Sequence, residues 1–303
     1  MIYFIVNPTA GSGKAKATVS VIEKVMSEHN IEPESGYSLI YTDAPVDFAR
    51  VSALIDYSIA KTIICVGGDG TVQEYVGLAA NKDIKFGIIP AGSGNDLILS
   101  IPSPDYIQKF SDYEKKIIFY TEKIFKDNII NLDAVSINGE NYFFNIGGTG
   151  IDIQVLKDAL PIKKYLSGGA YFISLVKNVF TYKAMEMTLT TDGEIETGKF
   201  TVLAICNGKF YGGNMRVCPP AVINDGYITL CKVKKMPRLK LMAMFPRVKS
   251  GKHATLKEVS FVNCASVKLE FEGKKIINLD GNLVEYESPL TFEILKDAVK
   301  FII

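Results

Sequence analysis

The sequence predicts a two-domain protein: an α/β domain with a parallel sheet, followed by an antiparallel β-sandwich domain. Short apolar runs alternate with stretches of helical spacing up to about residue 127. From Asn128 onward, strand-like runs follow one another between Asn-Gly, Asp-Gly and Glu-Gly turns. A chain of 303 residues is long enough for two domains. We therefore expect domains at 1–127 and 128–303, and the last residues could return to the first domain.

The composition is that of a globular protein, with 48% apolar and 22% charged residues. The net charge of +1 gives no argument for nucleic acid as a partner. Five cysteines are scattered without a CxxC pair, which indicates reduced core residues in a cytosolic protein. The chain enters a strand at once, and no uncharged apolar run approaches about 18 residues. We therefore expect a cytoplasmic protein without a signal peptide or a membrane span.

In the first domain, strands and helices alternate. The predicted strands are 2–6, 37–41, 62–66 and 86–89. The predicted helices are 15–29, 46–60, a helix from Thr71 to about Ala80, and a short helix at 106–113, before a segment at 115–126. Alternation of this kind predicts a parallel sheet with helices on both faces.

Three of these strands end in small, polar loops, which should converge at one edge of the sheet. In the loop after 62–66, the glycines allow a sharp turn and a close approach of a ligand, and Thr71 can cap the next helix. Asp69 lies in this turn, and a carboxylate beside phosphate implies an intervening metal ion or reacting hydroxyl. The loop therefore predicts a nucleotide phosphate site with Mg²⁺ chemistry. The alternative is a tight turn whose Asp69 bonds its own loop.

The second domain is predicted from strands and two interrupting helices. The predicted strands are 129–137, 141–146, 184–190, 199–207, 227–234, 266–271, 275–279 and 290–295. The predicted helices are 165–181 and 239–249. This spacing is typical of an antiparallel sandwich or barrel.

The loops together resemble the diacylglycerol kinase catalytic family, which includes bacterial soluble lipid kinases and sphingosine kinases. The matching segments in the first domain are Asn7-Pro8-x-x-Gly11, Gly67-Gly68-Asp69-Gly70-Thr71 with Glu74, and Pro90-x-Gly92-Ser93-x-Asn95-Asp96. The likeness continues through Asp133, Gly212-Gly213-Asn214-Met215 with Pro219, Asn224-Asp225-Gly226 and Asp280-Gly281. GGDG also occurs in NAD kinases and phosphofructokinases, whose fold the first domain is expected to share. The PxGSxND loop and the late Asp-Gly separate this chain from those enzymes.

The resemblance implies a site for ATP and Mg²⁺ that uses residues of both domains. The residues expected to contact ATP are Asn7, Pro8, Thr9, Ala10, Gly11, Thr42, Gly67, Gly68, Asp69, Gly70, Thr71, Val72 and Ser93. Asp69 and Asp96, with Asp133 from the second domain, are the carboxylates expected to organise catalytic Mg²⁺ and its waters. Asp225 matches a structural Mg²⁺ ligand, together with the main-chain carbonyls of Val222 and Tyr227. From the residues alone, Asn224-Asp225-Gly226 is a hairpin turn.

One position departs from the family. The family usually has Asp-Gly-Glu where this chain has Asp280-Gly281-Asn282. That Glu is one of two carboxylates credited with deprotonating the lipid hydroxyl, and a positioned general base contributes roughly 10²–10⁴-fold. Phosphoryl transfer depends mostly on positioning and charge neutralisation. We therefore expect an active kinase in which Asp280 is the base.

The implied partners are a lipid substrate and, transiently, a membrane surface. From Gly226 to Lys257 the chain carries only basic charges, next to apolar residues such as Leu239 and Phe245. The alternative is a helix that packs on the sheet while its lysines are merely solvated. An exposed strand edge in the second domain could also pair two copies as a homodimer. The leading hypothesis is an ATP-dependent lipid kinase, and the alternatives are a kinase of a soluble hydroxyl compound and a nucleotide-binding regulatory homologue without catalysis.

Overall fold

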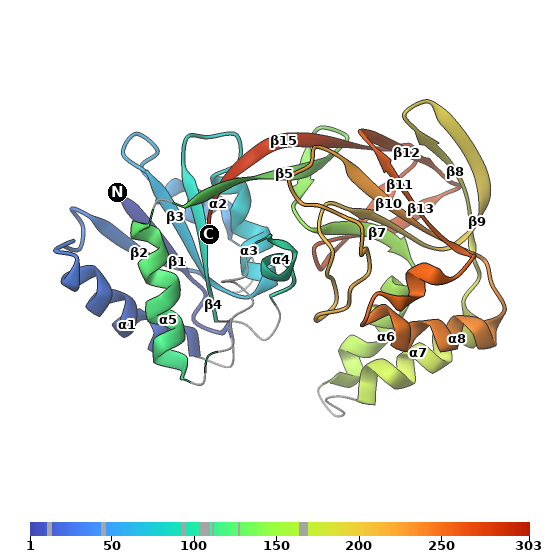
Figure 1. The fold of residues 1–303 in the computed structure, drawn as a ribbon, viewed down its shortest axis with the longest axis horizontal. Helices are drawn as coiled ribbons and strands as arrows, with labels where there is room; N and C mark the ends of the chain where they lie inside the picture. The colour runs from blue at the N-terminus through green and yellow to red at the C-terminus, as the bar shows by residue number, and fades with distance from the viewer. Residues whose placement is uncertain are drawn as a thin grey trace. The chain divides into compact units, whose positions relative to one another are not determined.

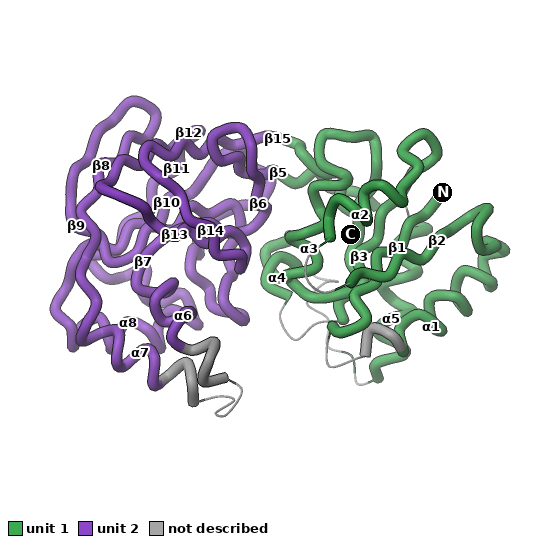
Figure 2. Tube along the Cα trace, turned by 180° about the vertical axis from the view of Figure 1, so that it is seen from behind, with its two compact units in different colours: residues 1–133, 296–303 green, residues 134–295 purple. Residues whose placement is uncertain are grey.

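The computed structural model describes residues 1–10, 14–43, 47–91, 95–102, 110, 112–126, 128–163 and 169–303, with only the backbone at 14–16, 159–163 and 169–172. By contacts the chain divides into two compact units, drawn in two colours in Figure 2. Unit 1 comprises 1–133 and 296–303, and unit 2 comprises 134–295. This division lies a few residues after the predicted boundary at 127, and the last residues of the chain lie in unit 1.

Unit 1 contains the predicted parallel sheet. Its strands are β1 (Ile2–Val6), β2 (Tyr37–Tyr41), β3 (Thr62–Gly67) and β4 (Lys85–Pro90). The order is β15-β4-β3-β1-β2, where the end of β15 (Leu290–Ile302) runs parallel to β4. Every residue of β3 is buried. Burial on both faces explains its continuous apolar sequence, and β1 and β3 pair in register from Ile2↔Thr62 to Val6↔Val66.

Helices cover both faces of this sheet, as predicted. They are α1 (Lys14–Glu28), α2 (Phe48–Ala53), α3 (Asp69–Tyr75), α4 (Asp96–Ser100) and α5 (Tyr113–Glu122), with single 3₁₀ turns η2 (Val76–Leu78) and η4 (Lys123–Phe125). Helices α1 and α5 lie together on one face, and α2 lies on the other (Figures 1 and 2). The helix predicted at 46–60 is shorter in the structure, because Asp56 accepts hydrogen bonds from the backbone N–H and hydroxyl of Ser58 and forms a turn there. The helix predicted at 106–113 lies mostly outside the described residues.

Unit 2 is built mainly from antiparallel strands, as predicted. They are β5 (Ile129–Ile137), β6 (Asn141–Phe143), β7 (Ile146–Gly150), β8 (Met185–Thr191), β9 (Glu194–Cys206), β10 (Ile228–Lys234), β11 (Val259–Cys264), β12 (Ser266–Glu270), β13 (Lys274–Leu279) and β14 (Asn282–Glu287), together with most of β15. The strand order is β14-β13-β7-β9-β8-β12-β15, while β10 pairs with β9 and β11, and β5 pairs with β6 and β15. Strands β11 and β14 were not among the predicted strands, and the predicted strand 141–146 covers β6 and only the first residue of β7.

A helical layer gives unit 2 a second hydrophobic core. Helices α6 (Ile151–Lys163), α7 (Gly169–Thr181) and α8 (Arg238–Val248) gather on one side of the strands, next to the 3₁₀ helix η5 (Lys252–Thr255) (Figure 1). One core, which includes Phe200 and Phe292, lies among the strands. The other includes Val155 and Met244 and lies between strands and helices. The five cysteines are buried and free, which confirms their prediction as reduced core residues.

Candidate functional site

The loop after β1 is held by the side chain of Asn7. Its Nδ2 donates to Oγ1 of Thr71 at 3.0 Å, and its Oδ1 accepts from the backbone N–H and hydroxyl of Thr9 at 3.0 and 2.8 Å. Its backbone N–H also donates to the carbonyl oxygen of Val66 at 3.1 Å. The structure therefore joins two of the loops that the sequence predicted to converge.

The GGDG turn between β3 and α3 is tightly packed. A Cβ atom on Gly67 would lie 2.5 Å from Oγ1 of Thr71, so only glycine fits there. Gly68 is the N-cap of α3, and the hydroxyl of Thr71 bonds Asn7 instead, so the predicted capping role of Thr71 is wrong. Helix α3 spans only Asp69–Tyr75, too short for a large dipole. Phosphate binding here would depend on the loop backbone and polar side chains.

Two of the three carboxylates predicted to organise Mg²⁺ come from loops that touch. Oδ1 of Asp69 accepts from the backbone N–H of Leu97 at 3.4 Å, which places it beside the turn that carries the buried Asp96. Asp133 is buried on β5, and its Oδ1 accepts from the backbone N–H of Asp297 at 2.9 Å. By contacts Asp133 is the last residue of the first segment of unit 1, whereas the sequence placed it in the second domain.

A magnesium ion at these carboxylates stays a prediction. In the part of the chain that the structure describes, no group of three or more His, Cys, Asp or Glu side chains could hold a metal ion. Mg²⁺ usually keeps several waters and binds through one or two carboxylates and substrate phosphates. Asp69 and Asp96 offer oxygen ligands of that kind, whereas the carboxylate of Asp133 accepts a hydrogen bond from the backbone of β15.

The remaining residues predicted to contact ATP differ in their exposure. The partly or fully exposed ones are Asn7, Pro8, Thr9, Ala10, Gly68, Asp69 and Gly70, whereas Thr42, Gly67, Thr71 and Val72 are buried. Gly11 and Ser93 lie outside the described residues. Glu74 accepts a hydrogen bond from the backbone N–H of Asp47 at 3.1 Å, so it fixes the segment before α2. The exposed part of the predicted site is thus the Asn7–Ala10 loop and the GGDG turn.

In unit 2, Asp280 holds the connection between β6 and β7. Its carboxylate accepts hydrogen bonds from three successive backbone N–H groups, those of Phe144, Asn145 and Ile146, at 2.7 to 3.1 Å. Such donors stabilise a negative carboxylate. Asp280 therefore has a clear structural role, and its role as the base stays a prediction. Asn282 begins β14 and is exposed.

Buried asparagines connect the Asp280 turn to the segment with Gly212 and Gly213. Asn278 donates to the hydroxyl of Tyr211 and accepts from the N–H of Gly281 at 2.8 Å. Asn145 donates to the carbonyl oxygen of Phe210 at 2.6 Å. This network was absent from the sequence interpretation. Its sequence signal is an asparagine within a strand-like run, which requires buried partners.

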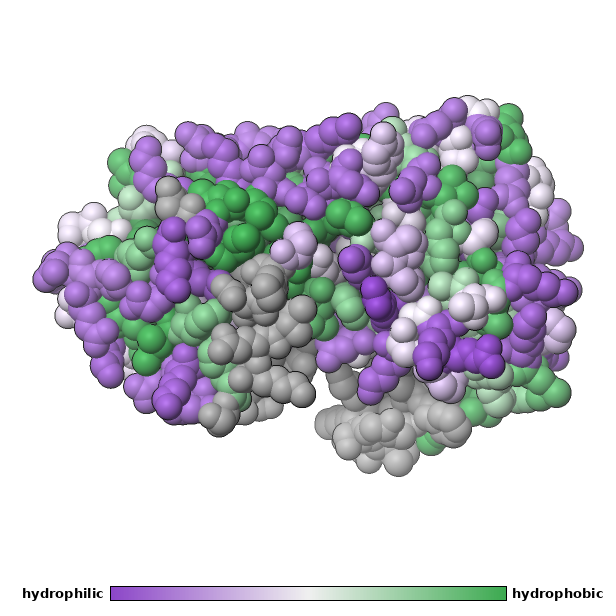
Figure 3. All heavy atoms as spheres, viewed as in Figure 1, coloured by the Kyte–Doolittle hydropathy of each residue, from purple (hydrophilic) through white to green (hydrophobic). Residues whose placement is uncertain are grey.

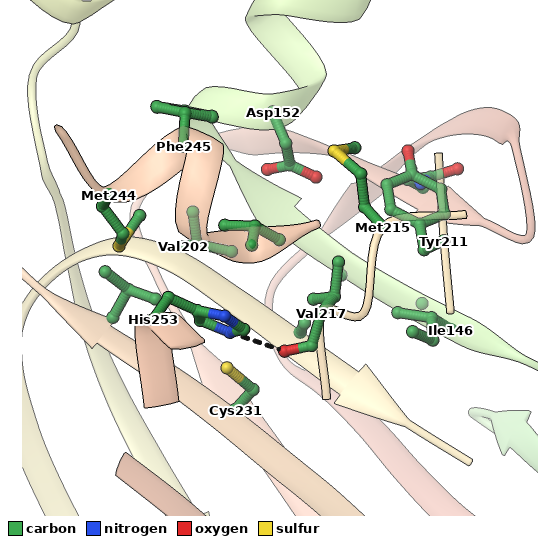
Figure 4. Close-up of a pocket in the computed structure, with 16 residues that line it drawn as sticks. Ile146, Asp152, Val202, Tyr211, Met215, Val217, Cys231, Met244, Phe245 and His253 are labelled. Atoms are coloured by element: carbon green, nitrogen blue, oxygen red, sulfur yellow. Dashed lines mark hydrogen bonds between the residues drawn. The ribbon is translucent and has the colours of Figure 1, made fainter. Parts of the chain in front are cut away.

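A cavity of about 510 Å³ lies among α6, α7 and α8. Its wall is mainly apolar and includes Val155, Leu156, Leu175, Val176, Met242 and Phe245. A smaller space of about 70 Å³ shares part of this lining and reaches His253 (Figure 4). The larger volume is typical of small-molecule sites.

Asp152, in the first turn of α6, is the one carboxylate among the described residues that line either space. Its Oδ1 is fully buried and has no hydrogen-bond partner among the described residues. Figure 4 shows its side chain beside Met215 and Phe245. Burial raises the pKa of Asp152 from 3.8 to about 6. A buried polar atom without a partner is costly, so this oxygen is suited to accept a hydrogen bond from a ligand.

The predicted structural metal site lies in a turn before β10. Oδ1 of Asp225 accepts from the backbone N–H of Tyr227 at 3.0 Å, and Gly226 has a φ of 76°. Val222 and Tyr227 are both exposed. The geometry is that of an Asx turn. A metal ion held by Asp225 and the carbonyls of Val222 and Tyr227 stays a prediction.

An α/β unit with a GGDG turn, followed by a β-sandwich unit, defines a class of phosphotransferases that act on alcohols. Two family models match the chain: the diacylglycerol kinase catalytic domain over residues 1–137, and the YegS C-terminal NAD kinase beta sandwich-like domain over residues 146–303. The chain belongs to this family of diacylglycerol kinase-like proteins.

Curated relatives and solved structures agree with this assignment. A diacylglycerol kinase of Mycobacterium tuberculosis is 28% identical over 80% of this chain and 76% of its own length. A diacylglycerol kinase of Bacillus subtilis is 25% identical over 91% and 88%. The crystal structure of a diacylglycerol kinase from Bacillus anthracis matches 99% of this chain and 96% of its own with a TM-score of 0.77 at 22% identity, which shows the shared fold. Among the described residues, no helix is both long and apolar enough to cross a bilayer.

Proposed function

We propose that the chain is an ATP- and Mg²⁺-dependent kinase that phosphorylates a hydroxyl group of a diacylglycerol-like lipid. The main support is the cavity in unit 2, whose apolar wall suits a hydrocarbon chain far better than a soluble sugar or polyol. Relatives that cover most of the chain are named diacylglycerol kinase, which favours a lipid acceptor.

In this proposal unit 1 binds the nucleotide. Asn7 and Thr9 hold the loop after β1, and Asp69 and Asp96 supply the oxygen ligands for Mg²⁺. Bound Mg²⁺ would offset the negative charge of the phosphate groups during transfer. The backbone of the loop after β1 positions the nucleotide phosphates. The hydrogen bonds of Asn7 and Thr9 hold this loop in one conformation.

Unit 2 binds the lipid. The apolar cavity takes an acyl chain, and the unpaired oxygen of Asp152 accepts a hydrogen bond from a polar group at the head of the lipid. Asp280 takes the proton of the reacting hydroxyl. Three backbone N–H groups already occupy its oxygens, and Asn282 replaces the usual second carboxylate, so we expect slow turnover.

The test is transfer of labelled phosphate from ATP with Mg²⁺ to dioleoylglycerol, sphingosine, a polyprenol and free glycerol. We expect turnover with dioleoylglycerol and none with glycerol. Equal turnover with glycerol would instead identify a kinase of soluble compounds. ATP binding without turnover on any acceptor would favour the regulatory alternative, and activity gained by Asn282→Glu would then locate the missing base.

A further inference from the structure

A second pocket, of about 330 Å³, opens on unit 2 where α7 ends and α8 begins. Of the ten described residues that line it, four are cationic and none is acidic. The cations are Lys183, Lys199, Lys235 and Arg238. They come from three segments: the residues after α7, strand β9, and the residues that lead into α8.

Close to the pocket, on β10 and α8, other basic side chains have acidic partners. Lys232 and Lys234 on β10 both bond Glu196, at 2.5 and 2.8 Å. Lys240 on α8 bonds Glu258 at 2.6 Å. The protein therefore neutralises its lysines on either side of the pocket.

At the pocket itself, most of the positive charge is unpaired. Lys183, Lys235 and Arg238 have no ion pair with any carboxylate of the described residues. Lys199 has one partner, Glu186, at 3.3 Å, and this pair is exposed. Exposed pairs of this kind contribute little. An external anion would therefore meet several available cations.

The position of Arg238 and Lys235 is also unfavourable without an anion. Arg238 is the first residue of α8, Lys235 precedes it closely, and the first turn of this helix has no acidic residue and no side-chain cap. The N-terminus of a helix carries partial positive charge and disfavours nearby cations. Lys183, in contrast, lies just past the end of α7, where a cation is favourable by itself. A bound anion would therefore explain why Lys235 and Arg238 lie at the N-terminus of α8.

Exposed apolar side chains flank the same pocket. Leu239 is 75% exposed on α8, and Phe180 is 46% exposed near the end of α7. Figure 3 shows hydrophobic side chains along the lower right edge of this unit, where Figure 1 draws α7 and α8. Cations beside exposed apolar residues are typical of protein surfaces that lie in a membrane interface.

We propose that this pocket binds the phosphate group of an anionic phospholipid and seats unit 2 on a membrane surface. Arg238, Lys235 and the first N–H groups of α8 hold the phosphate, while Leu239 and Phe180 enter the acyl boundary. The binding needs neither ATP nor a hydroxyl acceptor, so it can be tested separately from the kinase activity.

The experiment measures sedimentation with vesicles of phosphatidylcholine alone and of equal parts phosphatidylcholine and phosphatidylglycerol, without nucleotide. We expect binding only to the anionic vesicles. Lys235→Ala with Arg238→Ala should weaken it about 30-fold, since each cation near an anionic surface contributes a factor of about five. Lys235→Arg with Arg238→Lys keeps the charge and should retain binding.

The matched control is Arg247→Ala with Lys252→Ala, which removes the same charge from exposed positions near the other end of α8. A loss equal to that of the pocket variant would show a diffuse attraction and overturn the pocket as the site. Equal binding of the wild type to neutral vesicles would overturn the role of the anion. Binding of soluble glycerol 1-phosphate that needs Lys235 and Arg238, without any vesicle binding, would identify a free phosphate site and also overturn the proposal.

Discussion

In unit 1, the polar side chains that follow β1 and β3 are hydrogen-bonded to each other and to nearby backbone. In unit 2, Asp152 faces an apolar cavity, and one of its oxygens has no hydrogen-bond partner among the described residues. In unit 1, Asn7 uses both ends of its amide, and Asp69 contacts the backbone of the next loop. In unit 2, Oδ1 of Asp152 has no partner among the described residues. The two regions therefore differ in whether their polar side chains are already hydrogen-bonded within the protein.

This difference between the loop of unit 1 and the cavity of unit 2 implies different sources for the free energy of ligand binding. A loop that is already fixed by hydrogen bonds loses little conformational entropy when a ligand arrives. A cavity with an unpaired buried oxygen gains from a ligand that supplies both apolar surface and one donor. Changes in unit 1 should therefore affect rate first, and changes in the cavity should affect stability and the choice of lipid.

The largest effect is expected from Asp69→Asn. Loss of this carboxylate removes charge from the predicted magnesium site, so phosphate transfer should fall about 10²- to 10³-fold while the melting temperature changes little. Labelled phosphate transfer and a thermal melt measure the two quantities. Asp83→Asn, an exposed carboxylate of the same unit paired with Lys300, is the control. Unchanged transfer in Asp69→Asn would show that the turn is purely structural.

The second prediction concerns Asp280→Asn. An amide keeps only one acceptor oxygen and turns an N–H₂ group toward backbone donors, so unit 2 should lose about 3–4 kcal/mol in free energy of unfolding. Denaturant unfolding measures this loss. Glu285→Gln, an exposed position on β14, is the control. A stable but inactive Asp280→Asn variant would instead make catalysis, and not support of the β6–β7 connection, the main role of this residue.

The third prediction is a pH dependence at Asp152. Its pKa is raised to about 6, so between pH 3.8 and about 6 the folded protein keeps a proton that the unfolded chain has lost. The free energy of unfolding should therefore fall as pH rises through this range. Asp152→Asn removes that loss and should be more stable than the wild type by about 2–3 kcal/mol at pH 7, and equal to it near pH 4.

Denaturant unfolding at both pH values measures this difference. The exposed Glu272→Gln should show no such change. A gain in Asp152→Asn that is the same at both pH values would exclude the charge of Asp152 as its cause.

The smallest effect is expected from Val176→Phe, which adds volume inside the cavity. The KM for dioleoylglycerol should rise about tenfold, while the KM for ATP stays unchanged. Steady-state kinetics with both substrates measure this, and Val284→Phe, on exposed β14, is the control. A rise in the KM for ATP alone would contradict the assignment of lipid binding to unit 2.

Much of unit 1 could be predicted from the sequence because its signals are local. The strands before Asn7, Gly67 and Ala91 are apolar runs that end in glycine-rich or polar loops, and parallel strands place those ends at one edge. The role of Thr71 was mistaken because its hydroxyl finds a partner, Asn7, that is far away in the sequence.

The cavity in unit 2 could not be predicted, because helix α6 was missed. Ile151, Ile153 and Val155 alternate with polar residues, which is the period of a strand over a short window. Tertiary packing against α7 and the strands decides the helical form instead. The unpaired oxygen of Asp152 also has no local signature, since burial depends on all three helices.

The end of β15 has a consequence for how the protein is made. Phe301 is fully buried against Phe86 in unit 1, and the N–H of Ile303 donates to the carbonyl oxygen of Asn128. A ribosome releases these residues only after all of unit 2 has been synthesised. Unit 1 therefore begins folding before unit 2 is made and completes its sheet only after β15 has emerged, and until then the edge of β4 is open to a chaperone or to a neighbouring nascent chain.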